Sequence, residues 1–213
     1  MGTLEDCRLA ISYLPWFSYN ATGGGGTAFA SELQQDGRLP VRFNVDALVV
    51  PPLNSTSIRV GGWLPLPPRF QIDIRPQVRH LVKHANSKAP RNLLPPESNH
   101  TAPPPMLSMQ VLEGWICRRT GEVRLQYDAV FRLSAPFYHP PDLVVRTLLT
   151  TERAHGGPAA LQGRRLDTEG RAVLVGSARV PKTHHLLSDV LLALPAQAQA
   201  VMSAQFTFTH LET

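Results

Sequence analysis

The sequence has only two cysteines among its 213 residues, Cys7 and Cys117. No Cys-x-x-Cys or similar pair exists, which excludes a metal site built on sulfur ligands. The wide spacing leaves two alternatives, one disulfide or two separate thiols. We expect two buried, reduced thiols, because free cysteine behaves as a small apolar side chain and Cys117 lies in a strand-like run.

Charged residues and long apolar runs are also scarce. Charged residues make up 17% of the chain, against roughly a quarter in an average soluble domain. No run approaches the ~18 apolar residues of a membrane span, and the first residues lack the pattern of a secretion signal. We therefore expect a soluble intracellular protein. The apolar share of 43% is enough for one sizeable core, and the length fits a single β domain over residues 1–213.

Local signatures of catalysis are missing as well. The chain contains no Gly-x-Ser-x-Gly, no phosphate-binding P-loop and no His-Glu-x-x-His. His80 and His84 have the spacing of two metal ligands on a helix, but no third ligand accompanies them and two solvated histidines are the favoured reading. We predict no catalytic residue, no metal site and no cofactor, and we lean against an enzyme.

What the chain does contain is a succession of strand patterns. In residues 69–75, for example, Phe70, Ile72 and Ile74 alternate with polar side chains, as in a half-buried strand. Strands at short spacing without long helices between them predict an all-β fold, an antiparallel sandwich or barrel. The expected strands are 39–50, 57–64, 69–75, 106–119, 122–133, 143–151, 171–180 and 205–212.

Residues 1–38 are expected to be an irregular apolar arm, because Pro15 interrupts the apolar run at 7–19. The glycines at 23–26 would form its flexible joint. Residues 85–105 contain six prolines among 21 residues and predict a long Pro-rich surface loop or insertion.

The only expected helix covers residues 184–194, with Thr183 as N-cap. Pro195 either ends it or begins a second short turn over residues 195–204. We expect it to cover one side of the sheet or the mouth of a barrel. The apolar residues on one face of this helix are Leu186, Leu187, Val190, Leu191 and Leu194.

A basic segment lies between residues 69 and 91, which contain six basic residues and only one acidic residue, Asp73. Such a patch can bind an anionic membrane surface or phosphate groups. Nucleic acid is an unlikely partner, because side chains that would stack on bases are missing there. The equally weighted alternative is a solvated strand edge whose charges prevent pairing with other sheets. The six basic residues are Arg69, Arg75, Arg79, Lys83, Lys88 and Arg91.

Two tryptophans are candidates for an apolar binding cavity. Trp63 and Trp115 each follow a glycine, where a backbone bend can aim the indole into a curved sheet. The alternative for both is ordinary core packing, which is the commoner role of aromatic side chains on a sheet.

The runs LVVRTLLTTE (143–152), RRLDTEGRAVLVGSARVP (164–181) and LLSDVLLALPAQAQAVMSAQFTF (186–208) form a block of structural motifs: a Thr-Thr-Glu strand end, an Asp-x-x-Gly-Arg turn, a strand, a helix and a last strand. This block resembles one in uncharacterised β-rich proteins of plants, green algae and cyanobacteria. The resemblance implies a chloroplast setting and carries over no functional residue. The N-terminus lacks a Ser- and Arg-rich transit peptide, which fits a mature or incomplete chain or a different location.

These observations favour a non-catalytic binding module for an apolar small molecule or lipid, acting at an anionic membrane surface through the basic segment. The alternative is a ligand-free protein-interaction or assembly factor, and an enzyme without a recognisable motif comes third. A ligand binder needs an enclosed apolar cavity, an assembly factor an exposed apolar patch, and an enzyme a cleft with convergent polar groups.

Overall fold

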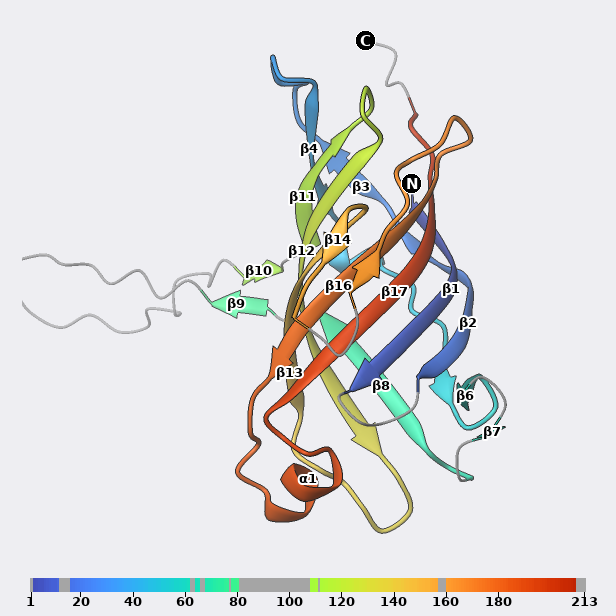
Figure 1. Ribbon diagram of the computed structural model, residues 1–213, viewed down its shortest axis with the longest axis vertical. Coiled ribbons are helices and arrows are strands. Elements are labelled where there is room, and N and C mark those ends of the chain that lie inside the picture. The colour runs from blue at the N-terminus through green and yellow to red at the C-terminus, as the bar shows by residue number, and fades with distance from the viewer. Residues whose placement is uncertain are drawn as a thin grey trace, which may run out of the picture.

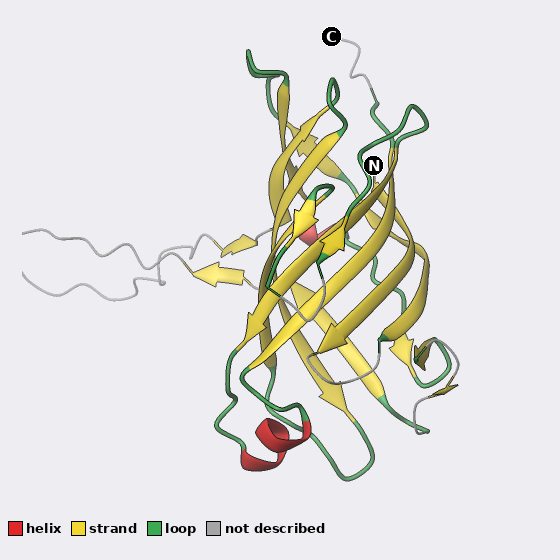
Figure 2. Ribbon diagram, viewed as in Figure 1, coloured by secondary structure: helices red, strands yellow, loops and turns green. Residues whose placement is uncertain are grey.

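The computed structural model describes residues 2–11, 16–61, 64–65, 68–76, 78–80, 108–110, 112–156 and 160–209. Within them the chain forms one large antiparallel sheet of 13 strands, two two-stranded sheets and one short α-helix (Figures 1 and 2). The all-β prediction is thereby confirmed. The expected Pro-rich loop at 85–105 lies outside the described residues.

The N-terminal part contains β1 (Gly2–Ile11), β2 (Phe17–Gly26), β3 (Ala28–Ala30), β4 (Arg38–Phe43), the 3-10 helix η1 (Val45–Ala47), β5 (Leu53–Asn54), β6 (Ile58–Val60), β7 (Leu64–Pro65), β8 (Gln71–Pro76) and β9 (Val78–His80). The C-terminal part contains β10 (Ser108–Gln110), β11 (Leu112–Cys117), β12 (Glu122–Ser134), β13 (Leu143–Thr150), β14 (Arg153–Ala154), β15 (Leu161–Gln162), β16 (Arg171–Val180), α1 (Leu186–Leu191) and β17 (Ala196–Phe206).

The large sheet follows the order β3-β4-β11-β12-β13-β16-β17-β1-β2-β6-β7, with β8 and β5 attached beside this path. The long strand β12 makes this branch possible: its first half pairs with β11 and its second half, on the same edge, with β8. The sheet is strongly curled, and its inner faces look toward one another (Figure 1). Among the described residues no ladder joins β3 to β7, so the curled sheet is not closed.

The expected irregular arm is instead a strand in the middle of the sheet. Strand β1 pairs with β17 on one edge and with β2 on the other. A proline weakens a strand when it lies within that strand. Pro15 comes after the end of β1 at Ile11 and before the start of β2 at Phe17, and it lies outside the described residues. The expected glycine joint is part of β2. A Cβ on Gly25 would lie 2.2 Å from the carbonyl oxygen of Gly2, so glycine there permits two backbones to approach closely.

Two further expectations need correction. The strand expected at 39–50 ends at Phe43, and η1 begins at Val45. The helix covers only Leu186–Leu191, and its N-cap is His185 in place of Thr183. The residues after Pro195 extend as β17, which begins nine residues before the last strand that we expected at 205.

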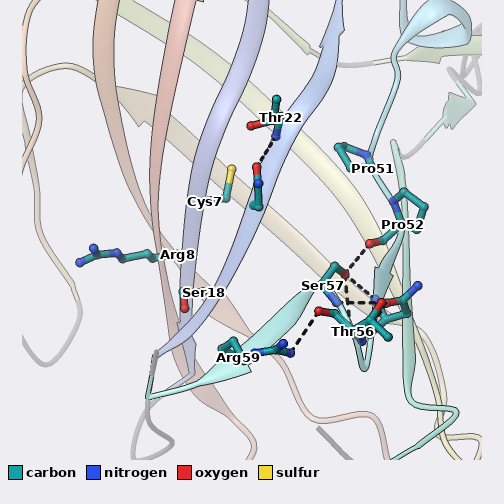
Figure 3. A pocket seen from close by; sticks show the side chains of 11 residues that line it. Cys7, Arg8, Ser18, Thr22, Pro51, Pro52, Thr56, Ser57 and Arg59 are labelled. Atoms are coloured by element: carbon teal, nitrogen blue, oxygen red, sulfur yellow. Dashed lines mark hydrogen bonds between the residues drawn. The ribbon is translucent and has the colours of Figure 1, made fainter. Parts of the chain in front are cut away.

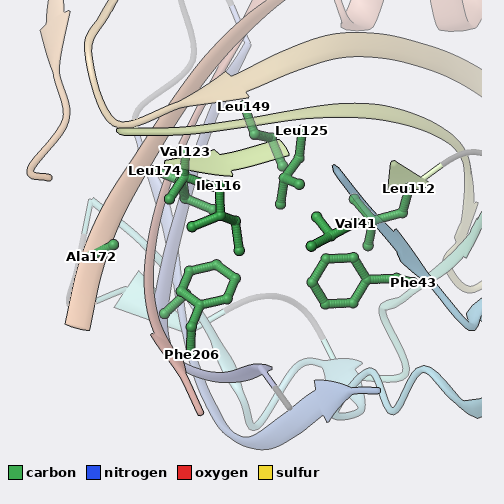
Figure 4. Close-up of a cluster of buried hydrophobic side chains, with 11 residues drawn as sticks. Val41, Phe43, Leu112, Ile116, Val123, Leu125, Leu149, Ala172, Leu174 and Phe206 are labelled. Carbon is green, nitrogen blue, oxygen red and sulfur yellow. The ribbon is translucent and has the colours of Figure 1, made fainter. Parts of the chain in front are cut away.

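The core fills the inside of the curled sheet in three clusters. The first lies between β4, β11, β12, β13, β16 and β17, where the rings of Phe43 and Phe206 point into the same group of aliphatic side chains (Figure 4). The second lies under β1, β2, β5 and β6. The third lies at the end of the sheet that carries α1 and includes Leu143, Val180 and Leu194. Both cysteines are buried and neither forms a disulfide, as expected.

Candidate ligand-binding cavity

Strand β17 contributes an unusually small inner surface to the interior. Its inward residues Ala198 and Ala200 stand in register with Ala178 and Gly176 of β16. On the other edge of β17 their partners are Ile11 and Leu9 of β1. Because side chains alternate along a strand, the four small residues of β16 and β17 lie side by side on one wall of the interior.

The opposite walls carry bulkier side chains. Phe131 and Leu133 of β12 stand in register with Ile74 and Ile72 of β8, and Phe131 also pairs with Leu143 of β13. The space between the small and the bulky walls is a cavity of about 130 Å³. An apolar cavity of about 150 Å³ is known to stay dry and to bind small apolar molecules. Here too the lining is almost entirely aliphatic and aromatic.

A second apolar cavity of about 90 Å³ lies farther along the interior. The two cavities have four lining residues in common, Ile74, Tyr127, Leu149 and Met202. The wall between the two cavities therefore includes the flexible side chain of Met202. A change of side-chain rotamer can shift such a wall without a movement of the backbone. Met202 and Tyr127 are among the residues that line both cavities.

The polar residues of the lining are Thr147, Tyr127 and Gln199, and the first two carry hydroxyl groups. The Thr147 hydroxyl donates a hydrogen bond to the Ser177 carbonyl at 2.9 Å and keeps acceptor capacity. Burial, and next the nearby Cys7, raise the pKa of Tyr127, so its phenol is neutral at physiological pH. No described residue hydrogen-bonds the Tyr127 hydroxyl, which leaves this group able to bond a ligand beside a mostly apolar space. Tyr127 is also the only ionisable side chain among the cavity's described lining residues, so the site lacks the convergent groups of general acid–base catalysis.

A polar groove of about 730 Å³ lies outside the sheet, between β2 and the β5–β6 turn (Figure 3). Its polar groups serve the turn itself. The Arg59 guanidinium donates to the carbonyls of Ser55 and Thr56, and the side chain of Asn54 accepts from Thr56 and Ser57. Arg8 extends away from the other side chains (Figure 3). The groove therefore has no set of free groups directed at one point.

Of the two candidate tryptophans, Trp63 lies outside the described residues. Trp115 does not line the interior cavities. It alternates with the inward residues Leu112 and Ile116 of β11, and its ring lies on the other face between two arginines, 4.3 Å from Arg38 and 5.8 Å from Arg124. The glycine before Trp115 does not turn the indole inward, because the alternation of the strand continues through it.

The basic segment is described only in part. Arg69 is exposed in the turn before β8. Arg75 belongs to β8 and Arg79 to β9. The other three members, Lys83, Lys88 and Arg91, lie outside the described residues, so a common surface of the six stays a prediction.

The fold and the cavity define the class as an antiparallel β protein with an apolar interior cavity. None of its described helices is long and apolar enough to cross a membrane. A comparison with protein-family models, curated proteins and solved structures finds no match.

Proposed function

We propose that this protein is a non-catalytic binding module that holds an apolar or amphipathic small molecule inside the curled sheet. The observation that supports the proposal is the 130 Å³ apolar cavity between the small residues of β16 and β17 and the bulky residues of β8, β12 and β13. Protein cores rarely leave voids much larger than a water molecule, whereas this one has room for about four water molecules at ~30 Å³ each.

The cavity also indicates the kind of ligand. It is smaller than the roughly 300 Å³ of a typical drug-sized site, and it continues toward a second narrow space behind Met202 and Tyr127. A linear hydrocarbon chain fits this shape better than a fused ring system. A single hydroxyl or carbonyl group on the chain would find the Tyr127 hydroxyl as its donor.

The test uses a homologous series of linear fatty acids from hexanoic to hexadecanoic acid, with binding measured by titration calorimetry. Each methylene that enters the cavity contributes about 0.8 kcal/mol, or about a fourfold gain in affinity. We expect this gain for the shorter acids and a plateau once the two cavities are filled. Affinity that grows without a plateau, or no binding of any acid, would contradict the proposal.

The Ala200→Leu variant tests whether fatty acids bind in the cavity inside the curled sheet. Its larger side chain would occupy the cavity, so we expect fatty-acid binding to be lost while the free energy of unfolding rises by roughly 0.5–2 kcal/mol. Ala160→Leu, at an exposed residue away from the cavity, is the matched control and should change neither quantity. Equal binding by wild type and Ala200→Leu would place the ligand elsewhere.

The alternative function is a protein-interaction or assembly factor that holds no ligand. One observation favours it, the exposure of apolar side chains on α1. The two functions differ in the fatty-acid titration, because an assembly factor needs no ligand and should show no chain-length dependence.

A further inference from the structure

Exposed apolar side chains gather at the end of the molecule that carries α1. This end also holds the loop between β12 and β13 (Figure 1). Leu186 is 81% exposed and Val190 68% exposed, and Phe137, in the loop, is fully exposed. We call this surface the apolar tip; its residues are Phe137, Leu186, Leu187, Val190 and Leu191.

The orientation of α1 is the reverse of what its sequence predicts. A surface helix normally turns its apolar face to the core, but the buried residue of α1 is Ser188. The Tyr138 hydroxyl donates to the Ser188 hydroxyl at 3.0 Å, and the Ser188 hydroxyl lies 2.8 Å from Nδ1 of His185. These bonds fix the helix to the loop that carries Phe137, so the two parts of the tip form one unit.

Phe137 has a backbone conformation that is uncommon for its residue type. It follows Pro136 in the turn closed by Ala135 and Tyr138, and its φ is +63°. Glycine is the usual residue with positive φ at this turn position, because a side chain there is sterically disfavoured. A large aromatic side chain is thus held out in solvent at some conformational cost, which is typical of a functional position.

The rim of the tip is basic. Arg179, Lys182, His184 and His185 are exposed around α1, and no described acidic residue pairs with Arg179 or Lys182. Two acids lie nearby. Asp142 is paired with Arg132 through both oxygens at 3.0 Å. Asp189 accepts from the backbone and hydroxyl of Thr183 at 2.8 Å and keeps its negative charge, which Arg179 and Lys182 outnumber.

We propose that the apolar tip docks on an anionic membrane surface, with Phe137 and the leucines of α1 in the headgroup region and the basic rim against the lipid charges. Apolar side chains surrounded by cations are the recurring pattern of helices that lie in a membrane interface. The tip projects as a helix and a turn, which suits insertion into lipid. Docking stands without the interior ligand, and it uses different residues from the basic segment at 69–91.

The experiment is sedimentation with vesicles of phosphatidylcholine alone or mixed equally with phosphatidylglycerol. We expect the protein to bind the mixed vesicles and to bind less at higher salt. Phe137→Gly should weaken binding by about tenfold or more, because it removes a large apolar side chain from the lipid. Glycine suits the φ of this turn, so the variant should fold normally, which circular dichroism checks. Phe29→Gly, at a 72% exposed residue of β3 near the opposite end, is the matched control and should bind like wild type.

Charge is tested separately. Lys182→Gln and Arg179→Gln should each weaken binding to the mixed vesicles by about fivefold and leave binding to phosphatidylcholine unchanged. Ala200→Leu should bind vesicles like wild type, so failure of this proposal and failure of the ligand proposal are distinguishable. Absence of vesicle binding, or an equal loss in Phe29→Gly, would overturn the proposal. Self-association that depends on Phe137 without vesicle binding would instead make the tip a contact between copies of the chain.

Discussion

At the scale of single residues, Thr151 shows how a side chain extends a strand ladder. Strand β13 ends at Thr150, yet the next residue still pairs with β12. The Thr151 amide donates to the Val123 carbonyl at 3.2 Å, and the Thr151 hydroxyl accepts from the Val123 amide at 3.0 Å. Thr151 is only 1% exposed, so water cannot replace this bond. The second threonine of the Thr-Thr-Glu strand end therefore has a structural role.

Thr151→Val keeps the shape of the side chain and removes its hydroxyl, so the buried Val123 amide loses its acceptor. An unsatisfied buried donor costs about 1–3 kcal/mol, and we expect the free energy of unfolding to fall by that amount in urea titrations. Thr151→Ser keeps the hydroxyl and should lose less. Thr22→Val, at an exposed position of β2, is the control and should leave the free energy of unfolding nearly unchanged. If Thr22→Val lost as much stability as Thr151→Val, the loss would come from replacing threonine in a strand and not from the buried hydrogen bond.

At the scale of elements, β17 is a strand where the local composition favours a helix. Residues 196–204 are rich in Ala, Gln and Met, which favour helices, but they form a strand with register pairs to β16 along its whole length and to β1 over most of it. Hydrogen bonding on both edges outweighs a propensity of a few tenths of a kcal/mol per residue. The signal available in the sequence is the alternation of Ala196, Ala198 and Ala200 with Gln197 and Gln199, which Val201 interrupts.

The attachment of α1 makes an element-scale prediction. We expect Ser188→Ala and Tyr138→Phe each to destabilise the protein, and the double variant to lose less than the sum, with a coupling of about 0.5–1.5 kcal/mol for one hydrogen bond. Hydrogen exchange of amides 186–192 should become faster in all three variants. Strictly additive losses would mean that the bond between loop and helix contributes nothing to the position of α1.

At the scale of the whole molecule, ion pairs join segments that are distant in sequence. Glu152, just after β13, contacts Arg124 of β12 at 3.1 Å and Arg165 at 3.0 Å. The hydrogen bonds from Arg165 and then Arg124 hold the pKa of Glu152 below its ordinary value. The pKa of Asp167 is also lowered, first by the backbone amide of Arg171, and this contact fixes the turn before β16.

These shifts predict the direction of acid denaturation. A carboxyl whose pKa is lower in the folded chain than in the unfolded chain stabilises the fold above its ordinary pKa, and this contribution is lost as pH falls through the folded-state value. We therefore expect stability in urea to decrease below about pH 4.5. Glu152→Gln should reduce the dependence on pH, whereas Glu32→Gln, which removes the same charge from an exposed site, should not. An unchanged pH dependence in Glu152→Gln would contradict this account.

The sequence alone determined the all-β class, the hairpin of β11 and β12, and the strands β8, β13 and β16. These features depend on local alternation and turn residues, which a single strand pattern contains.

Only the tertiary structure decided that residues 2–11 form a central strand, that Trp115 lies between Arg38 and Arg124, and that small residues of β16 and β17 face a cavity. It also decided that α1 exposes its leucines. Each of these depends on which strand becomes the neighbour and which face turns inward, and both are set by contacts between segments far apart in the chain, such as β1 with β17. A local pattern records that a strand has two faces, but the curl of the whole sheet determines which face encloses the interior.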